Sequence, residues 1–560
     1  MLTAVAPPVR FTDTILLRNA CLVSFDPPAV MHQDLMISNG LVTATGVDLK
    51  APSSCDVFDA SGMVLMPGFV DLRADLLSEP LPGFPELNAA ARPCMGEEAV
   101  IWSGFTAGLR ALRAGTTCVF AMQSAPGFAL GALPRLREVL LTLGLRGVLA
   151  YKAETGREGA AAASRDAALY GGGEQLRMAV GCGDAATAGP LLKELGALSE
   201  RCQVPFFGEA GVGGSGKEAL AALQDSGLAN ARAILTVGGG LDAAQAAELL
   251  ASGAALVHLP QEDLAAGRAL GSVPLAGAGI GSGCGSADVL AAARLAVGLA
   301  RGRGSALSGA EALAMIAVGH RVASKVFGLP FGSFEPGSVA DFVLWRYTPS
   351  MPLTAETVAE HVLEGLRSAQ IDCVIANGRF VIRQGKLQTL DENEILFAAQ
   401  RGAIDLHQRL TGRDWPGLAA LMAVPSHAAA IQHSDDDGTD LDAALENDDW
   451  NEDDSENGAT ENGDAAESTA TAPAAPGAVS ADLMEWPAED DLDPAAKPRA
   501  AAATAAVSDA EDDDLADDDD DDDDEADDAH DDEEDGDDSD EAPSQEAENN
   551  ADPFGFGVFS

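Results

Sequence analysis

Between residues 64 and 330 the chain alternates short apolar runs with longer segments of helical periodicity. In one such unit, apolar positions recur at helical spacing from Glu97 to Ala114, Gly115 ends the helix, and Thr116 to Ala121 follows as a strand. Repeated units of this length predict a parallel sheet covered by helices, as a (β/α)8 barrel or an open doubly wound sheet, and the residue count favours the barrel. The other predicted strands are 69–72, 147–151, 204–207, 233–237, 254–258 and 276–280, and the other predicted helices are 134–143, 189–201, 216–224, 242–251 and 286–300.

Both flanks of this region show a different pattern. Residues 14–65 contain short strands separated by turn signals such as Asn39-Gly40, which predicts a small β-domain. Strand patterns return at 332–345 and 371–387, where Asn377-Gly378 is a strong hairpin signal. A closing helix is predicted over 391–410.

Charge separates the last part of the chain from the rest. Residues 431–560 hold 49 Asp and Glu against 2 Lys and Arg, and so carry −47 of the total of −55, which leaves −8 for residues 1–430. So acidic a segment repels itself and has little apolar surface to bury, so we expect a disordered acidic tail. It would repel nucleic acid, and its apolar islands would dock a protein partner unless the tail only solubilises the chain. The island residues are Trp486, Phe554, Phe556 and Phe559.

The spacing of the cysteines and the length of the apolar runs indicate the cellular compartment of the protein. Eight cysteines lie far apart without a C-x-x-C pair, so neither a disulfide framework nor a zinc knuckle is indicated. No basic region leads into a long apolar run at the amino terminus, and no 18 residues run apolar without a charge or a breaker. We therefore expect a cytoplasmic protein that does not interact with membranes.

The stretch Pro67 to Leu76 carries the first candidate chemistry. A Pro-Gly turn joins an apolar run to a short strand, Phe69 to Leu72, that ends in polar residues. Catalytic residues of barrel enzymes lie at the carboxyl ends of the strands. Arg73 and Asp75 stand two positions apart there, so we expect both side chains to point to the same side.

Six motifs spread over the chain are typical of one family. They are V-S-F-D-P-P at 23–28, V-L-M-P-G-F-V-D-L at 64–72, A-G-T-T at 114–117, V-H-L-P at 257–260, G-S-F-E-P-G-S-V-A-D at 332–341 and V-I-A-N-G-R at 374–379. On these residues the chain, over about 14–410, resembles the amidohydrolase superfamily, in the branch of chlorohydrolases, cytosine and guanine deaminases and related aminohydrolases. The resemblance implies an α/β fold, a distorted (β/α)8 TIM barrel with a composite β-sandwich. The implied domains are the sandwich at 1–64 and 331–390, the barrel at 65–330, the closing helix at 391–415 and the acidic tail at 431–560.

The chemistry of this family requires a divalent metal, usually zinc or iron, which activates a water molecule for attack at a carbon–nitrogen or carbon–halogen centre. The family motif H-x-H falls here on Arg73 and Asp75, and H-x-x-E falls on Phe206 and Glu209. The later ligand His falls on Val237, and Gly240 stands where a substrate-side His is common. The final Asp falls on Gly283. An arginine keeps its charge, and Phe, Val and Gly have no donor side chain.

Asp75 alone remains as a candidate ligand, and a zinc site needs three or four protein ligands. His258 and His320 are the only histidines between residues 65 and 330, and neither falls on a ligand position. We therefore expect no cofactor, although the family would use zinc or iron.

Some polar residues at these positions have more than one interpretation. Glu209 keeps the proton-shuttle position, and is either a remaining proton-transfer group or a residual charge in need of a partner. Arg73 would be that partner if its guanidinium replaced the charge of the metal and paired with Asp75 or Glu209. Lys152 would join them or, as we favour, stay solvated.

Glycine segments and one cysteine also fall near the expected site. The segments 238–240 and 281–285 would form an anion-binding nest of backbone amides, or would be tolerated replacements in a disused barrel mouth, which we favour. Cys284 has no histidine neighbour in the sequence, so it is a weak candidate for a catalytic thiol.

The sequence thus predicts a catalytically degenerate member of the resembled family, a pseudoenzyme that serves as a binding or scaffolding subunit. It would form a homodimer or pair with an active paralogue. One alternative is an active hydrolase on carbon–nitrogen bonds, with a rearranged site around Asp75 and Glu209. Another is a small-anion binding protein that uses the glycine-rich mouth.

Overall fold

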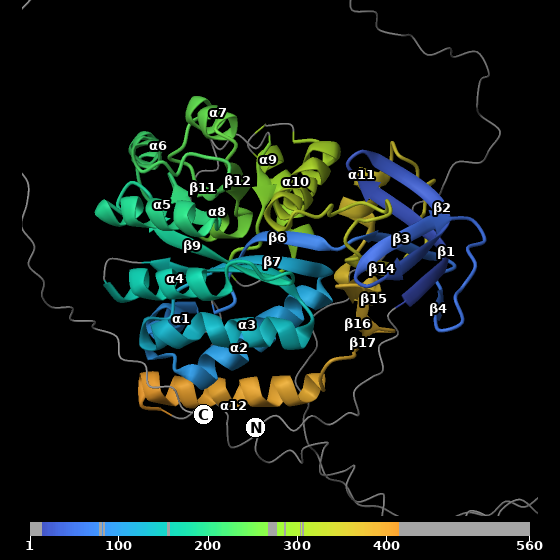
Figure 1. Cartoon of the computed structure of the whole chain (residues 1–560), viewed down its shortest axis with the longest axis horizontal. Coiled ribbons are helices and arrows are strands. Elements are labelled where there is room, and N and C mark those ends of the chain that lie inside the picture. The colour runs from blue at the N-terminus through green and yellow to red at the C-terminus, as the bar shows by residue number, and fades with distance from the viewer. Residues whose placement is uncertain are drawn as a thin grey trace, which may run out of the picture. The chain divides into compact units, whose positions relative to one another are not determined.

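The computed structural model describes residues 14–77, 81, 85–153, 157–266, 277–284, 287–302, 304 and 307–413. Within these residues, eight parallel strands form one sheet in chain order, from β6 to β13. A bridge between Ala74 and Gly283 brings the two edges of the sheet together, so the barrel is nearly closed (Figure 1). The predicted barrel is therefore confirmed over the open sheet. Its strands are β6 Phe69–Ala74, β7 Thr116–Gln123, β8 Arg146–Ala153, β9 Leu176–Asp184, β10 Phe206–Ala210, β11 Ala233–Val237, β12 Ala255–His258 and β13 Gly279–Ile280.

Helices surround the barrel, and most of them bury an apolar face against the strands (Figure 1). In α2 the buried face includes Val100, Leu109 and Leu112. α3 ends at Gly144, whose φ of 82° is left-handed and suits glycine. The helices are α1 Pro85–Ala91, α2 Glu97–Arg113, α3 Ala129–Leu143, α4 Arg157–Tyr170, α5 Pro190–Cys202, α6 Gly216–Asp225, α7 Ala243–Ala251, α8 Pro260–Ala265, α9 Val289–Gly302 and α10 Gly309–Phe327.

Alternating strand residues divide the barrel into an inner and an outer core. In β7, Phe120 belongs to a cluster of inward-facing strand residues, whereas Val119 belongs to the cluster shared with the helices. Val318 and Phe327 of α10 join the inner cluster. The carboxyl end of α10 thus covers the amino ends of the strands and leaves the opposite end as the mouth.

A second sheet combines strands from both flanks of the barrel, in the order β17-β16-β15-β14-β5-β1-β2-β3, with β4 paired to β1. Its strands enclose a core of their own, which includes Leu35, Leu65 and Phe342. The fold class predicted from the resemblance is confirmed for the described residues. The strands are β1 Thr14–Phe25, β2 Pro28–Ser38, β3 Leu41–Gly46, β4 Asp56–Asp59, β5 Met63–Pro67, β14 Phe342–Arg346, β15 Ile371–Ala376, β16 Arg379–Arg383 and β17 Lys386–Leu387.

The sequence pattern missed one barrel strand, β9, and four of the helices around the barrel, α1, α4, α8 and α10. β9 carries Arg177 near its start and glycines at 181 and 183, which weaken a strand signal. Packing explains one of these glycines, because a Cβ atom on Gly181 would lie 2.7 Å from the sulfur of Met122. The strand is therefore specified by contacts inside the barrel rather than by its own propensity.

The closing helix is α12, Glu392–Thr411, which lies along α2 (Figure 1). Arg113 of α2 forms an ion pair with Glu392. Short helical turns complete the chain at η1 Arg92–Cys94, η2 Pro126–Phe128, α11 Val358–Glu360, η3 His361–Gly365 and η4 Ser368–Gln370. In the described part, no helix is long and apolar enough to cross a membrane. The predicted acidic tail and its islands at Trp486, Phe554, Phe556 and Phe559 lie outside the described residues.

Candidate functional site

A buried carboxylate fixes the strand end that carries the candidate residues. Asp71 of β6 is fully buried and accepts hydrogen bonds from the backbone N–H groups of Arg73 at 3.1 Å and Ser282 at 3.0 Å, and from the Ser282 hydroxyl. Burial raises the pKa of Asp71, although the hydrogen bonds from Ser282 and Arg73 oppose this shift. Gly283 N–H also donates to the Arg73 carbonyl at 2.8 Å. β6 is thereby joined to the segment after β13.

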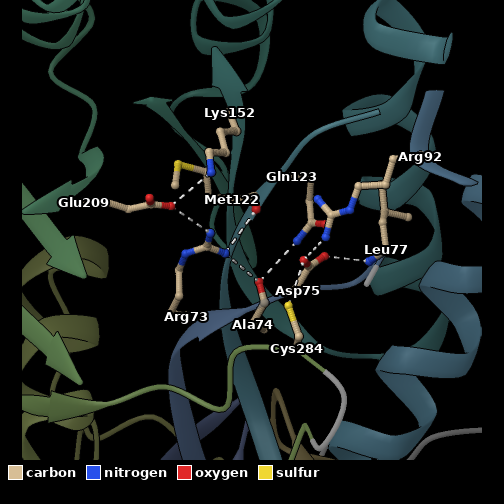
Figure 2. A network of polar contacts seen from close by, with 10 residues as sticks. All are labelled: Arg73, Ala74, Asp75, Leu77, Arg92, Met122, Gln123, Lys152, Glu209 and Cys284. Atoms are coloured by element: carbon tan, nitrogen blue, oxygen red, sulfur yellow. Dashed lines mark hydrogen bonds and ion pairs between the residues drawn. The ribbon is translucent and has the colours of Figure 1, made fainter. Parts of the chain in front are cut away.

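One carboxylate lies between two cations at the mouth (Figure 2). The Arg73 guanidinium is 3.8 Å from Oε1 of Glu209, and Nζ of Lys152 is 3.1 Å from the same oxygen. Arg73 also donates to the carbonyl of Met122 at 3.2 Å, and its side chain is only 11% exposed. The prediction that Arg73 pairs with Asp75 or Glu209 is confirmed, and its partner is Glu209. The expectation that Lys152 is solvated is wrong, because β8 directs it to Glu209.

Asp75 takes part in a separate group of contacts. It forms an ion pair with Arg92, accepts from the Leu77 N–H at 3.0 Å, and lies 3.6 Å from the sulfur of Cys284. Figure 2 shows Arg73 and Asp75 directed to different partners, so the expectation of a shared side is wrong. The reason is that β6 ends at Ala74, and strand alternation does not extend to Asp75. Sequence reasoning missed Arg92, which lies in the short turn η1 and belongs to no recognisable motif.

The loops after β10 and β11 lie backbone against backbone. The N–H of Gly238 donates to the carbonyl of Ala210 at 3.1 Å, and that of Gly240 donates to Gly211 at 2.9 Å. A Cβ atom on Gly240 would lie 2.3 Å from the Gly214 carbonyl oxygen. These amides are therefore not free for an anion, and the glycines are required by packing. The anion-binding interpretation of the segment 238–240 is therefore wrong for Gly238 and Gly240.

The loop after β13 is equally constrained. The N–H of Gly281 donates to the carbonyl of His258 at 3.0 Å. A Cβ atom on Gly283, whose φ is +60°, would lie 2.6 Å from Oε1 of Glu262 in α8. The Glu262 carboxylate thus occupies the space that an aspartate at position 283 would need.

The remaining aligned positions supply no polar group. Phe206 and Val237 are buried in the outer core that the strands share with the helices. His258 forms a buried pair with Asp263 at 3.2 Å. Nε2 of His320 is 2.9 Å from the Gly68 carbonyl oxygen, and burial lowers the pKa of this histidine. Both histidines therefore have partners within the fold.

Cys284 is a poor candidate for a nucleophile. Burial, together with the nearby carboxylates of Asp75 and Glu262, raises the pKa of its thiol. Thiolate is the reactive form, and this environment disfavours it. The structure thus argues against a catalytic thiol.

The donors at the mouth do not fit a zinc ion. Among the described residues, no group of three or more His, Cys, Asp or Glu side chains is arranged to hold a metal. Both mouth carboxylates, Asp75 and Glu209, are already paired with cations. A further cation there would meet Arg73 and Lys152, and the Coulomb repulsion would oppose its binding.

Three comparisons place the chain among known proteins. No family model matches it. It is 24% identical over 439 residues to a 5-methylthioadenosine/S-adenosylhomocysteine deaminase of Desulforudis audaxviator, a match that covers 70% of this chain and 98% of the relative. Two solved structures are similar to 70% of the chain at a TM-score of 0.60. They are the zinc complex of atrazine chlorohydrolase from Arthrobacter aurescens TC1, 19% identical and covered to 100%, and a zinc-bound adenosine deaminase from Xanthomonas campestris, 20% identical and covered to 98%.

The chain therefore has the fold of the amidohydrolase superfamily. Within it, the chain resembles the branch of deaminases and chlorohydrolases, as its motifs predicted. Both structures just described contain zinc, which agrees with the metal expected of the family. The difference lies in this chain's own mouth, where an arginine and a lysine flank the retained glutamate.

Proposed function

We propose that this chain is a cytoplasmic amidohydrolase-fold protein that does not carry out metal-dependent hydrolysis and acts as a binding or scaffolding subunit. One observation carries the proposal: the Arg73 guanidinium and the Lys152 ammonium both bind the only retained family carboxylate, Glu209. In the family mechanism that glutamate transfers protons to and from metal-activated water. Here it is held between two fixed cations, and Arg73 supplies positive charge where the family would use a metal.

The packing around positions 240 and 283 supports this proposal. Restoring the final aspartate would require Glu262 to move away from position 283, and restoring a histidine at position 240 would separate two loops. A site lost only through exchange of its ligands would have kept room for them. In this chain that room is filled by backbone and by the Glu262 side chain.

The comparisons favour a second candidate, an active hydrolase on carbon–nitrogen bonds. The three proteins described above are two deaminases and a chlorohydrolase, and Glu209 lies beside a lysine. In such an enzyme, Lys152 and Glu209 would exchange a proton with the substrate amino group and with water, without a metal.

One experiment separates the two candidates. The purified full chain is analysed for bound metal, and ammonia release is measured from adenosine, 5-methylthioadenosine and S-adenosylhomocysteine, with and without added zinc. We expect much less than one metal per chain and no ammonia above the blank. Ammonia release that Glu209→Gln abolishes, but that a chelator does not, would establish the second candidate. Near-stoichiometric zinc with zinc-dependent turnover would overturn the first.

A further inference from the structure

A pocket of about 300 Å³ lies at the amino ends of the strands, away from the Arg73–Glu209 contacts. Its walls come from the starts of β9, β11 and β12 and from one face of α10. Ile234, Val318 and Val322 give it an apolar surface. The volume lies at the lower limit of small-molecule sites.

Four cationic side chains line this pocket, namely Arg177, Arg232, Arg321 and Lys325. No acidic residue is among the described residues that line it. Residues 1–430, which include the pocket, carry a formal charge of −8, so a group of four cations without an acidic neighbour in the lining is unexpected. These positive charges are therefore expected to contact negatively charged groups.

The described contacts balance only part of this charge. Arg232 pairs with Glu200, and Arg321 pairs with Asp26. Arg177 is held by backbone carbonyls, with 3.3 Å to that of Phe327 and 3.1 Å to that of Gly173.

The last of the four cations, Lys325, donates to the carbonyl of Gly253 at 3.2 Å. Burial lowers its pKa, as expected of an ammonium that lacks a carboxylate partner. Nε of Arg232 is buried without a hydrogen-bond partner, although the same guanidinium binds Glu200. The pocket thus keeps a surplus of positive charge and an unused donor.

We propose that this pocket binds a small molecule that carries a phosphate group. A phosphate accepts hydrogen bonds from arginine and lysine together, and these charge-assisted bonds are the strong ones. The apolar surface formed by Ile234, Val318 and Val322 would contact the uncharged part of the ligand. This site is independent of the barrel mouth and of the function proposed for it.

Calorimetric titration of the full chain tests the proposal with inorganic phosphate, AMP and adenosine as probes. We expect saturable one-site binding of phosphate, tighter binding of AMP, and no binding of adenosine at this pocket. Because the contacts are ionic, the affinity should fall as salt is added. The double variant Arg321→Gln/Lys325→Gln removes the charges of two exposed side chains of α10. It should raise the dissociation constant for AMP by at least about tenfold.

The matched control is Lys193→Gln/Arg301→Gln, which removes the same charge from two exposed positions outside the pocket. It should leave AMP binding within about twofold. Because all four positions are exposed, both double variants should keep the wild-type melting temperature. The proposal is overturned by an absence of saturable binding up to about 10 mM probe, by equal losses in the two double variants, or by loss in Arg73→Gln instead.

Discussion

At the carboxyl ends of the barrel strands, Glu209 lies between Arg73 and Lys152, whereas at the amino ends the described contacts give Arg177 and Lys325 backbone carbonyls and, for Arg177, the Phe327 ring, but no carboxylate. At the end of the barrel where this fold places catalysis, the two cations thus share one carboxylate of the fold. The opposite end, which normally only stabilises the barrel, keeps a surplus of positive charge around a pocket. The difference teaches that ligand binding need not stay where the fold's chemistry lies, because charge without a partner is what attracts a ligand.

The largest expected effect tests whether the mouth is closed by backbone packing. In Gly240→Ala, the new Cβ would lie 2.3 Å from the Gly214 carbonyl oxygen, and neither backbone segment can turn away as a side chain would. We expect a loss of about 3 kcal/mol in the free energy of unfolding, measured with urea. Gly298→Ala is the control, since its Cβ meets nothing within 4 Å in the helix α9, and it should stabilise by up to about 1 kcal/mol. If the two variants had the same free energy of unfolding, the loops after β10 and β11 would have room for a Cβ atom at position 240.

The next largest effect tests the ion pairs that Glu209 forms with Arg73 and Lys152. Glu209→Gln would leave Arg73 and Lys152 close together without their carboxylate, and should cost about 2 kcal/mol. Adding Arg73→Gln should recover part of this loss, so the double variant should be more stable than the sum of the single effects by about 1 kcal/mol. Additive losses in this mutant cycle would show that the 3.8 Å contact has no energetic weight.

A smaller effect concerns the carboxylate that joins β6 to the last barrel segment. Burial raises the pKa of Asp71 in the folded chain, so the stability that its protonated form contributes is complete below the ordinary aspartate pKa of about 3.9. That contribution is lost as pH rises through the folded value. The stability of the wild type relative to Asp71→Asn, measured by urea unfolding across pH, should therefore fall as pH rises. A difference that grows with pH would show that the hydrogen bonds from Ser282 outweigh burial.

The smallest effect is kinetic and leaves the fold unchanged. Cys284 and Cys94 are both exposed, but desolvation and the carboxylates of Asp75 and Glu262 raise the pKa of Cys284, so iodoacetamide should alkylate it more slowly at pH 8 than it alkylates Cys94. Mass spectrometry of peptides from partly labelled protein gives both rates. Glu262→Gln should speed the reaction at Cys284, and faster labelling of Cys284 in the wild type would remove the case against a reactive thiol.

Much of the fold could be predicted from sequence. The helical periodicity of Glu97–Arg113, its Gly115 boundary and the strand that follows are local signals, and they match α2 and β7. β9 was not predicted because Arg177, Gly181 and Gly183 weaken its local strand signal. Its hydrogen bonds come from pairing with the neighbouring barrel strand β8. Local signals therefore account for α2 and β7, although α10 was not predicted even though it begins with a capping box formed by Ser308 and Glu311.

The candidate site was less accessible to sequence reasoning. The motifs located Arg73, Asp75 and Glu209, and charge alone suggested that an arginine would meet a carboxylate. The choice of Glu209 rather than Asp75 depends on where β6 ends, and Arg92 reaches Asp75 from a turn that no pattern marks. The pocket cations come from three elements that are far apart in the chain, so no spacing rule connects them.

By itself the sequence determined the alternation of strands and helices, the charge of the tail and the residue types at the positions where the resembled family has metal ligands, because each is a property of neighbouring residues or of residue identity. Only the tertiary structure decided which charges neutralise one another, which glycines are required by packing and where positive charge remains. Coulomb and steric energies depend on distances of a few ångströms between residues that the barrel brings together from distant parts of the chain.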